Sequence, residues 1–151
     1  MLPIKTILCP TDFSPASLAG VKAATELASH FGAEICLTYV VPTIPVPSSD
    51  PVYDFELPEY EKLLHADAEK KLRELHDAMV AAKVSVRTMV GHGDAAGEIV
   101  LIAGKEHVDL IVIATHGWTG LRHLVFGSVA EKVVRLAPCP VLTIRAPQAQ
   151  G

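Results

Sequence analysis

Short apolar runs alternate with longer stretches of helical periodicity along the whole chain. Five runs have the length and the β-branched content of buried strands, at residues 4–9, 34–40, 84–90, 109–114 and 141–145. Strands that alternate with helices are typical of βαβ units, which build a parallel sheet. The run Ile111-Val112-Ile113 is apolar at every position, as strands covered on both faces require. The pattern therefore predicts an α/β fold with an open, five-stranded parallel sheet and helices on both faces.

Two helices have clear signals in the sequence. The first is expected to begin near Ser14, a good N-cap residue that is followed by Pro15 at the first helical position, and to end before Gly32. The second is a long amphipathic helix, because apolar residues recur three and four positions apart at Leu64, Ala68, Leu72, Leu75 and Met79. Both helices would lie between strands and cover the sheet.

A proline-dense segment separates the second strand from the long helix. Residues 42–58 hold five prolines and cannot belong to the interior of a sheet, so they are predicted to form a long loop with extended stretches. A loop of this length is commonly a lid or a contact surface, but a tolerated insertion is equally compatible with the sequence. Residues 146–151 form a short tail, and no internal repeat is present. We therefore expect one domain over residues 1–151.

Composition narrows the classes of function. The chain has 151 residues, of which 50% are hydrophobic, and a formal net charge of −4 without a dense block of lysine and arginine. This charge argues against partners such as DNA or RNA. The N-terminus lacks the layout of a signal peptide, and no apolar run is long enough to span a bilayer. These features predict a cytoplasmic protein without a membrane anchor.

The three cysteines form no metal or redox motif. Cys9, Cys36 and Cys139 lie in or beside strand-like runs, without a C-x-x-C pair, and are interpreted as buried, reduced thiols. A reactive Cys9 near the end of the first strand is the less favoured alternative, since the local sequence supplies no positive neighbour to stabilise a thiolate.

The segment after the fourth strand is the strongest candidate for chemistry. Gly117 lies just past that strand, nine residues separate it from Gly127, and Ser128 opens the helical pattern of residues 129–137. Glycine permits a close approach of backbone or ligand, and a helix N-terminus offers unpaired N–H groups and positive partial charge. The Ser128 hydroxyl can donate to a phosphate or hold a cation. The segment predicts a phosphate cradle, although the two glycines alone are also compatible with a plain strand end and helix start.

A second candidate segment follows the first strand. In open parallel sheets, ligands bind beyond the carboxyl ends of the strands where the strand order reverses. If the first and fourth strands are neighbours, residues 10–14 face the glycine segment across that crevice. The Asp12 carboxylate can accept hydrogen bonds from ribose hydroxyls or an adenine amine. Its alternative role is structural, as an Asx-turn or a helix cap.

Other motifs are weaker. Residues 91–96 fit G-x-G-x-x-A, but they follow the third strand and lack a suitably placed acidic partner, so we interpret them as a turn in which Asp94 caps the next helix. No P-loop motif is present. The seven histidines include no H-x-x-x-H pair typical of zinc sites, and His116 is expected to order its loop through a hydrogen bond.

The residues of these segments resemble the universal stress protein family, specifically its ATP-binding branch, over nearly the whole chain. The likeness lies in Pro10-Thr11-Asp12-Phe13-Ser14 and in residues 34–41, 91–94, 114–128 and 137–142. The nucleotide motif of that family is glycine, two residues, glycine, nine residues, glycine, then serine or threonine. Gly117, Gly127 and Ser128 match its last three elements, whereas Ala114 stands where the first glycine is expected.

The resemblance implies a Rossmann-like strand order of 3-2-1-4-5 and a homodimer paired through the last strand, residues 141–145. An edge strand that begins at Pro140 and is apolar would suit such pairing. By resemblance, the adenosine part of ATP would contact Pro10, Thr11, Asp12 and Val40. The phosphates would be surrounded by Gly117, Gly127, Ser128, Val129 and Ala130, with Ala114 and His116 inside the same cradle.

We therefore expect a dimeric stress-response protein that binds ATP, with Mg²⁺ bridging the phosphates. Rapid hydrolysis needs a positioned water, a base and strong cationic stabilisation, for which the sequence offers only Arg122, His116 and His123. Slow ATP hydrolysis at most, and hence a regulatory output, is expected. Two alternatives remain: a weak ATPase or phosphotransferase, and a nucleotide-free interaction protein in which Ala114 has disabled the cradle.

Overall fold

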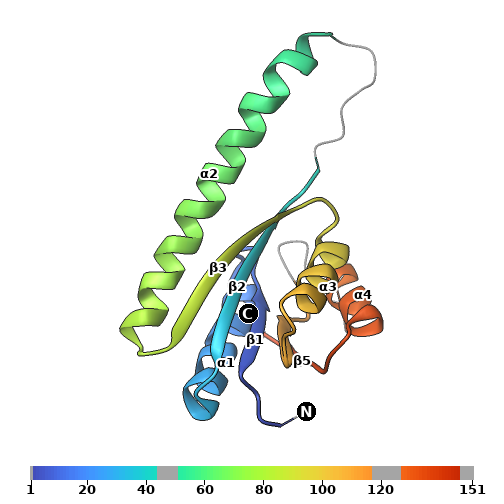
Figure 1. Cartoon of the computed structure of the whole chain (residues 1–151). Helices are drawn as coiled ribbons and strands as arrows, with labels where there is room; N and C mark the ends of the chain where they lie inside the picture. Colours follow the sequence, from blue (N-terminus) through green and yellow to red (C-terminus); the bar gives the residue numbers. More distant parts are fainter. Residues whose placement is uncertain (1, 44–50, 117–126, 147–151) are drawn as a thin grey trace, which may run out of the picture.

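The structure, a computed structural model, describes residues 2–43, 51–116 and 127–146. Its centre is a five-stranded parallel sheet in the order β3-β2-β1-β4-β5 (Figure 1). The predicted Rossmann-like sheet and its strand order are confirmed. The strands are β1 (Thr6–Pro10), β2 (Glu34–Val41), β3 (Ser85–His92), β4 (Leu110–Ala114) and β5 (Val141–Ile144).

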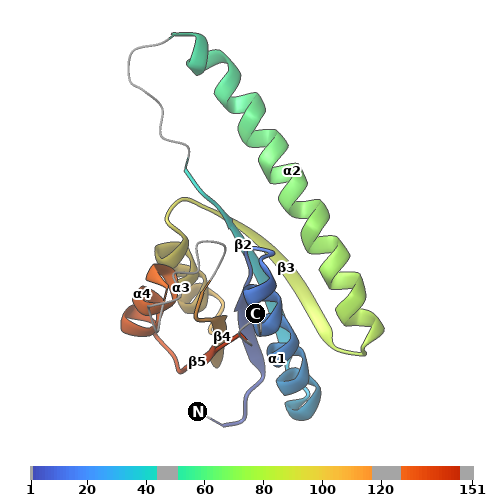
Figure 2. The ribbon, with the colours of Figure 1, turned by 180° about the vertical axis from the view of Figure 1, so that it is seen from behind.

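Helices cover both faces of the sheet, as predicted. One face packs against α1 (Pro15–Phe31) and α2 (Pro51–Ala81), and the other packs against α3 (Ala95–Lys105) and α4 (Ser128–Leu136) (Figures 1 and 2). Alternate residues of the central strand belong to the two cores, because successive side chains of a strand point to opposite faces. Ile7 and Cys9 lie in the core under α1 and α2, whereas Leu8 lies in the core under α3 and α4.

The ends of α1 lie where the sequence predicts them. The Ser14 hydroxyl caps the helix by accepting from the Ser17 N–H, and Pro15 occupies the first turn. Gly32 ends the helix with φ of 67°, in the left-handed region that glycine adopts without strain. These caps fix where the loop from β1 must turn into α1, and that loop borders the site described below.

The prediction of a loop over residues 42–58 is wrong in its second half. The helix α2 begins at Pro51, so residues 51–58 are helical, and residues 44–50 lie outside the described part of the chain. A proline suits the first turn of a helix, where its missing N–H would have no intrahelical partner. Pro58 lies inside α2 and removes one backbone donor there. The helix nevertheless continues, and its N-terminal half extends beyond the sheet (Figure 1).

The rest of α2 follows the predicted amphipathic pattern. Ala68, Leu72 and Met79 are buried against β2 and β3, and Leu64 and Leu75 are half-buried. At the edge of the sheet opposite β3, β5 pairs with β4 and is the last strand in the described part of the chain, as predicted, with Leu142 39% exposed. Within the described ranges, none of the helices combines the length and the apolar character needed to cross a membrane.

Candidate functional site

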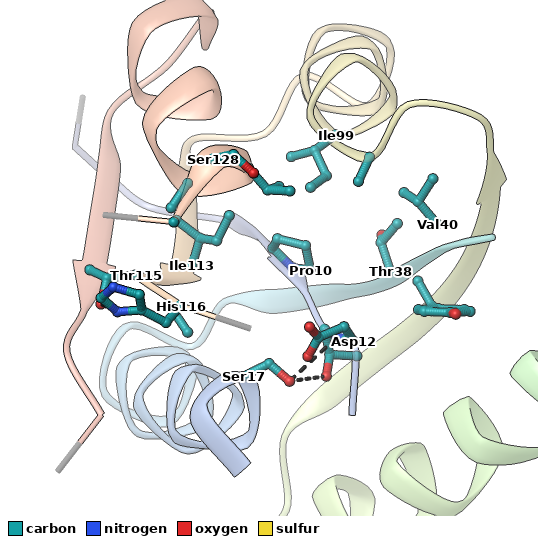
Figure 3. A pocket seen from close by; sticks show the side chains of 17 residues that line it. Pro10, Asp12, Ser17, Thr38, Val40, Ile99, Ile113, Thr115, His116 and Ser128 are labelled. Carbon is teal, nitrogen blue, oxygen red and sulfur yellow. Dashed lines mark hydrogen bonds between the residues drawn. The ribbon is translucent and has the colours of Figure 1, made fainter. Parts of the chain in front are cut away.

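A cavity of about 240 Å³ opens at the carboxyl ends of β1, β2 and β4 (Figure 3). Its floor is made by the strand ends, and the first turns of α3 and α4 form one side. The first residues of α1 and the loop before them contribute from the opposite face of the sheet. The connections from β1 and β4 diverge at this point, as expected for a ligand site in an open parallel sheet.

The structure brings together every candidate residue that it describes. Ten of them line this one cavity: Pro10, Thr11, Asp12, Val40, Ala114, His116, Gly127, Ser128, Val129 and Ala130. Gly117, the eleventh, lies outside the described residues. Segments more than one hundred positions apart in the sequence thus line one cavity.

Seven further residues line the cavity and were not named as site residues from the sequence. They are Ser17, Thr38, Tyr39, Ala95, Ile99, Ile113 and Thr115. Three of them adjoin predicted residues in β2, in β4 or just after β4, so the strand assignment alone could have found them. Ala95 and Ile99 lie one turn apart at the start of α3, and Ser17 lies in the first turn of α1. Their inclusion depends on helix packing, for which the sequence has no local signal.

Asp12 is held in a tight turn directly after β1. Its carboxylate oxygen Oδ1 accepts from the Ser14 N–H at 3.0 Å, which is the Asx-turn weighed as its structural role. The residue between them, Phe13, has φ of 64°, a conformation that bulky residues adopt only when their surroundings enforce it. Thr11 contributes by accepting from the Phe13 N–H at 3.0 Å. Asp12 therefore lines the cavity and shapes its loop at once.

The N-terminus of α4 has no side-chain cap among the described residues. Gly127 is the N-cap residue and has no side chain that could accept from the first turn, and Ser128, Val129 and Ala130 of that turn line the cavity. Backbone N–H groups in a first turn have no intrahelical partner and carry positive partial charge. This arrangement suits a phosphate or another anion.

The α3 N-terminus, on the same side of the cavity, is closed by a carboxylate. Asp94 Oδ2 accepts from the Gly97 N–H at 2.9 Å and from Lys132 Nζ of α4 at 3.2 Å. These hydrogen bonds, first that to Gly97 and then that to Lys132, hold the pKa of Asp94 below its usual value. The sequence interpretation of residues 91–96 as a turn with a helix cap is confirmed.

The methyl group of Ala114 faces α1. A Cβ built on Gly20 of α1 would lie 3.7 Å from Ala114 Cβ and 3.3 Å from Ala114 N. Glycine at position 20 thus gives α1 a close approach to this end of β4. Ala114, which stands where the motif has its first glycine, is accommodated because α1 has a glycine at the position that packs against it.

His116 makes a hydrogen bond within its own loop, and two of the three cysteines are buried. His116 Nδ1 lies 3.1 Å from Thr115 Oγ1, a hydrogen bond within its own loop, as expected. Cys9 is buried, and this burial, with a smaller effect of Cys36, raises the pKa of the Cys9 thiol to about 12. Cys9 is therefore a neutral thiol at physiological pH and not a nucleophile. Cys36 is also buried, whereas Cys139 is half-buried.

Comparison with known proteins gives a consistent result. Residues 3–145 match the sequence profile described as the Universal stress protein family. The chain is 37% identical to universal stress protein MJ0531 of Methanocaldococcus jannaschii over 144 residues, which cover 95% of this chain and 84% of that protein.

Solved structures agree in fold. The structure of protein MJ0577, a universal stress protein of the same organism, superposes with a TM-score of 0.84 at 29% identity, covering 97% of this chain and 99% of that one. A universal stress protein solved in complex with cAMP has a TM-score of 0.67 at 23% identity, over 95% of this chain and 98% of that one.

Proposed function

Because the chain belongs to the universal stress protein family, we propose that its cavity binds an adenine nucleotide and that nucleotide occupancy is the regulatory signal of a stress-response protein. The preferred ligand is ATP, with Mg²⁺ bridging its phosphates. One observation carries the proposal: the Asp12 turn lines the same cavity as the α4 N-terminus, which has no side-chain cap within the described part of the chain.

The two sides of the cavity suit the two ends of a nucleotide. Val40, Ile99 and Pro10 provide an apolar wall for a base, and the Asp12 carboxylate beside it accepts hydrogen bonds from ribose or base donors. At the end of the cavity beside α4, the N–H groups of residues 128–130 suit phosphate oxygens. The Asp12 carboxylate would repel phosphates, so its distance from α4 favours this orientation, whereas Asp94 near the α4 N-terminus is paired with Lys132.

The binding of Mg²⁺ would depend mainly on the phosphate oxygens of the nucleotide. No group of three or more His, Cys, Asp and Glu residues in the described part of the chain is arranged to hold a metal ion. The exposed Ser128 hydroxyl at the cavity is the side chain placed to complete the shell of a cation already held by phosphate oxygens. Mg²⁺ so bound would reduce the negative charge of the triphosphate.

The solved relative in complex with cAMP supports the ligand class, because it shares this fold. Hydrolysis is proposed to be slow at most. Lys132, the cation of α4 closest in sequence to the cradle, is engaged with Asp94. His116, a cavity residue of a type that can act as a general base, takes part in a hydrogen bond with Thr115.

We also propose a homodimer formed through the edge strand, residues 141–145. Leu142 on β5 is 39% exposed, and Val134 and Leu136 at the end of the neighbouring α4 are 47% and 49% exposed. Edge-to-edge pairing of two copies would satisfy the free backbone groups of β5 symmetrically.

The experiment starts with protein purified without added ligand, then denatured, with released molecules identified by mass spectrometry. About one adenine nucleotide per subunit, or calorimetric binding of Mg·ATP by the empty protein, supports the proposal. A protein that is empty and ignores Mg·ATP overturns it and favours the nucleotide-free alternative. Phosphate release well above that of a Ser128→Ala control would instead favour the weak ATPase. The native mass, compared with that of Leu142→Lys, tests the dimer.

A further inference from the structure

Ser17 is buried in the first turn of α1 and lines the cavity beside Asp12 (Figure 3), and its hydroxyl joins three groups of the loop that carries Asp12. Its hydroxyl oxygen lies 2.9 Å from Thr11 Oγ1, 3.0 Å from the Ser14 carbonyl oxygen and 3.3 Å from the Asp12 backbone nitrogen. None of the sequence motifs includes this residue.

The direction of each hydrogen bond follows from the number of protons. Ser17 has one hydroxyl proton, and the Ser14 carbonyl can only accept, so Ser17 donates to Ser14. Ser17 must then accept from the Thr11 hydroxyl and from the Asp12 N–H, which uses both of its lone pairs. Thr11 Oγ1 in turn accepts from the Phe13 N–H. The chain of hydrogen bonds is complete, and Ser17 is its central member.

We propose that Ser17 is a positioning residue that sets the Asp12 carboxylate for its contact with the nucleoside, an inference that rests on the proposed nucleotide function. The Asp12 backbone is anchored through Ser17, and its side chain is anchored through the Ser14 N–H. Between these anchors, Phe13 has a positive φ, a conformation that persists only when neighbouring contacts enforce it.

Loss of the Ser17 hydroxyl removes the partner of two donors, the Asp12 N–H and the Thr11 hydroxyl. The turn can then relax toward a negative φ at Phe13, which would displace the Asp12 carboxylate. The helix cap does not depend on this hydroxyl, because the Ser14 hydroxyl accepts from the backbone N–H of Ser17. Ser17→Ala therefore separates the support of Asp12 from the start of α1.

The test compares Ser17→Ala, Ser17→Thr, Asp12→Ala and the double variant Asp12→Ala/Ser17→Ala by calorimetry. The ligands are Mg·ATP, adenosine and inorganic tripolyphosphate with Mg²⁺. Ser17→Ala is expected to raise the Kd for Mg·ATP and adenosine about tenfold and to leave that for tripolyphosphate unchanged. Ser17→Thr keeps the hydroxyl and should restore most of the affinity. The double variant should bind no more weakly than Asp12→Ala, since both changes act on one contact.

Two results overturn the inference while leaving the proposed function in place. One is additive losses in the double variant, and the other is an equal loss for tripolyphosphate, which would indicate a general disturbance of the cavity. A wild-type protein that binds no adenine nucleotide removes the proposed function and this inference together. If Ser17→Ala does not fold, Ser17→Cys replaces it, because a thiol nearly preserves the volume but is a weak acceptor.

Discussion

Gly127 lies so close to Thr115 that a Cβ built on it would be 3.0 Å from the Thr115 carbonyl oxygen. The φ of Gly127 is −69°, which any residue can adopt, so the close approach is what requires glycine. The Gly127 N–H also donates to the same carbonyl oxygen. This contact joins the start of α4 to the residue after β4, and both segments line the cavity. The glycine thus fixes where the α4 N–H groups lie.

Gly127→Ala is expected to raise the Kd for Mg·ATP about tenfold and to lower the free energy of unfolding by about 1–3 kcal/mol. The backbone of Thr115 would have to move away from the new methyl group, and the first turn of α4 would move with it. Calorimetry and urea unfolding measure the two effects.

Gly104→Ala is the matched control, because a Cβ there would meet nothing within 4 Å. Position 104 lies in the last turns of α3, where alanine favours the helix by about 0.5–1 kcal/mol. Its Kd should equal that of the wild-type protein. If Gly127→Ala bound Mg·ATP with unchanged affinity, the contact between Gly127 and Thr115 would not be needed for nucleotide binding.

Ala114→Gly, which restores the glycine motif, should change the Kd for Mg·ATP less than about threefold. The Ala114 methyl lies beside Gly20 of α1, so we expect the ligand to be accommodated with the methyl in place. Glycine inside a strand should lower the free energy of unfolding by about 0.5–1 kcal/mol, measured by urea unfolding. A tenfold gain in affinity would show that the methyl obstructs the ligand, as the nucleotide-free alternative holds.

Local rules predicted the elements well where one interaction decides the outcome. The ends of α1 are determined by neighbouring residues, namely the Ser14 cap, Pro15 and Gly32, and were predicted correctly. The apolar runs likewise marked all five strands. The strand order could not be predicted by such local rules, because hydrophobic periodicity does not specify which strands are neighbours. It followed from the family resemblance, and the sheet confirms it.

Tertiary contacts account for what the sequence did not predict. Prolines at 51 and 58 suggested a loop, but a proline suits the first turn of a helix, and α2 continues through Pro58 to the part that packs on β2 and β3. In the site, Asp12 and Gly127 belonged to recognisable motifs. Ser17, Ala95 and Ile99 enter the cavity only because α1 and α3 pack at its edges.

The Asp94–Lys132 pair yields a prediction about charge. Asp94 directly precedes cavity residue Ala95, and Lys132 neutralises it across the two helix N-termini. Lys132→Met should raise the Kd for Mg·ATP about threefold to fivefold at low salt, because the uncompensated carboxylate repels phosphate, and the effect should fade at high salt. The Kd for adenosine should not change.

Asp94→Asn in the Lys132→Met background should restore the affinity for Mg·ATP. Asparagine caps helices as well as aspartate does, so α3 keeps its N-cap while the charge is removed. Calorimetry at two salt concentrations provides the measurement. Failure of Asp94→Asn to restore affinity would mean that Lys132 acts on the ligand directly, and not through Asp94.

Asp109 should make the stability of the fold depend on pH. Its Oδ2 accepts from the backbone N–H groups of Lys5 and Thr6 at 2.8 and 3.0 Å, which ties the start of β1 to the residue before β4. These two hydrogen bonds lower the pKa of Asp109 from its ordinary value of 3.8. A carboxyl group whose pKa is lower in the folded state stabilises the fold above the unfolded-state pKa. That stabilisation is lost as the pH falls through the folded-state pKa.

Asp109→Ala should therefore lower the free energy of unfolding by about 1 kcal/mol at pH 7. The difference in unfolding free energy between the variant and the wild-type protein should shrink as the pH falls below about 4. Urea unfolding at several pH values between 7 and 3 measures this difference, with Glu74→Ala at an exposed position of α2 as the control. If this difference in unfolding free energy stayed constant between pH 7 and 3, the stabilisation would come from the position of the Asp109 oxygen and not from its negative charge. Because Asp109 lies at the opposite ends of the strands from the cavity, the Kd for Mg·ATP of Asp109→Ala should match the wild-type value at pH 7, which separates loss of stability from loss of the site.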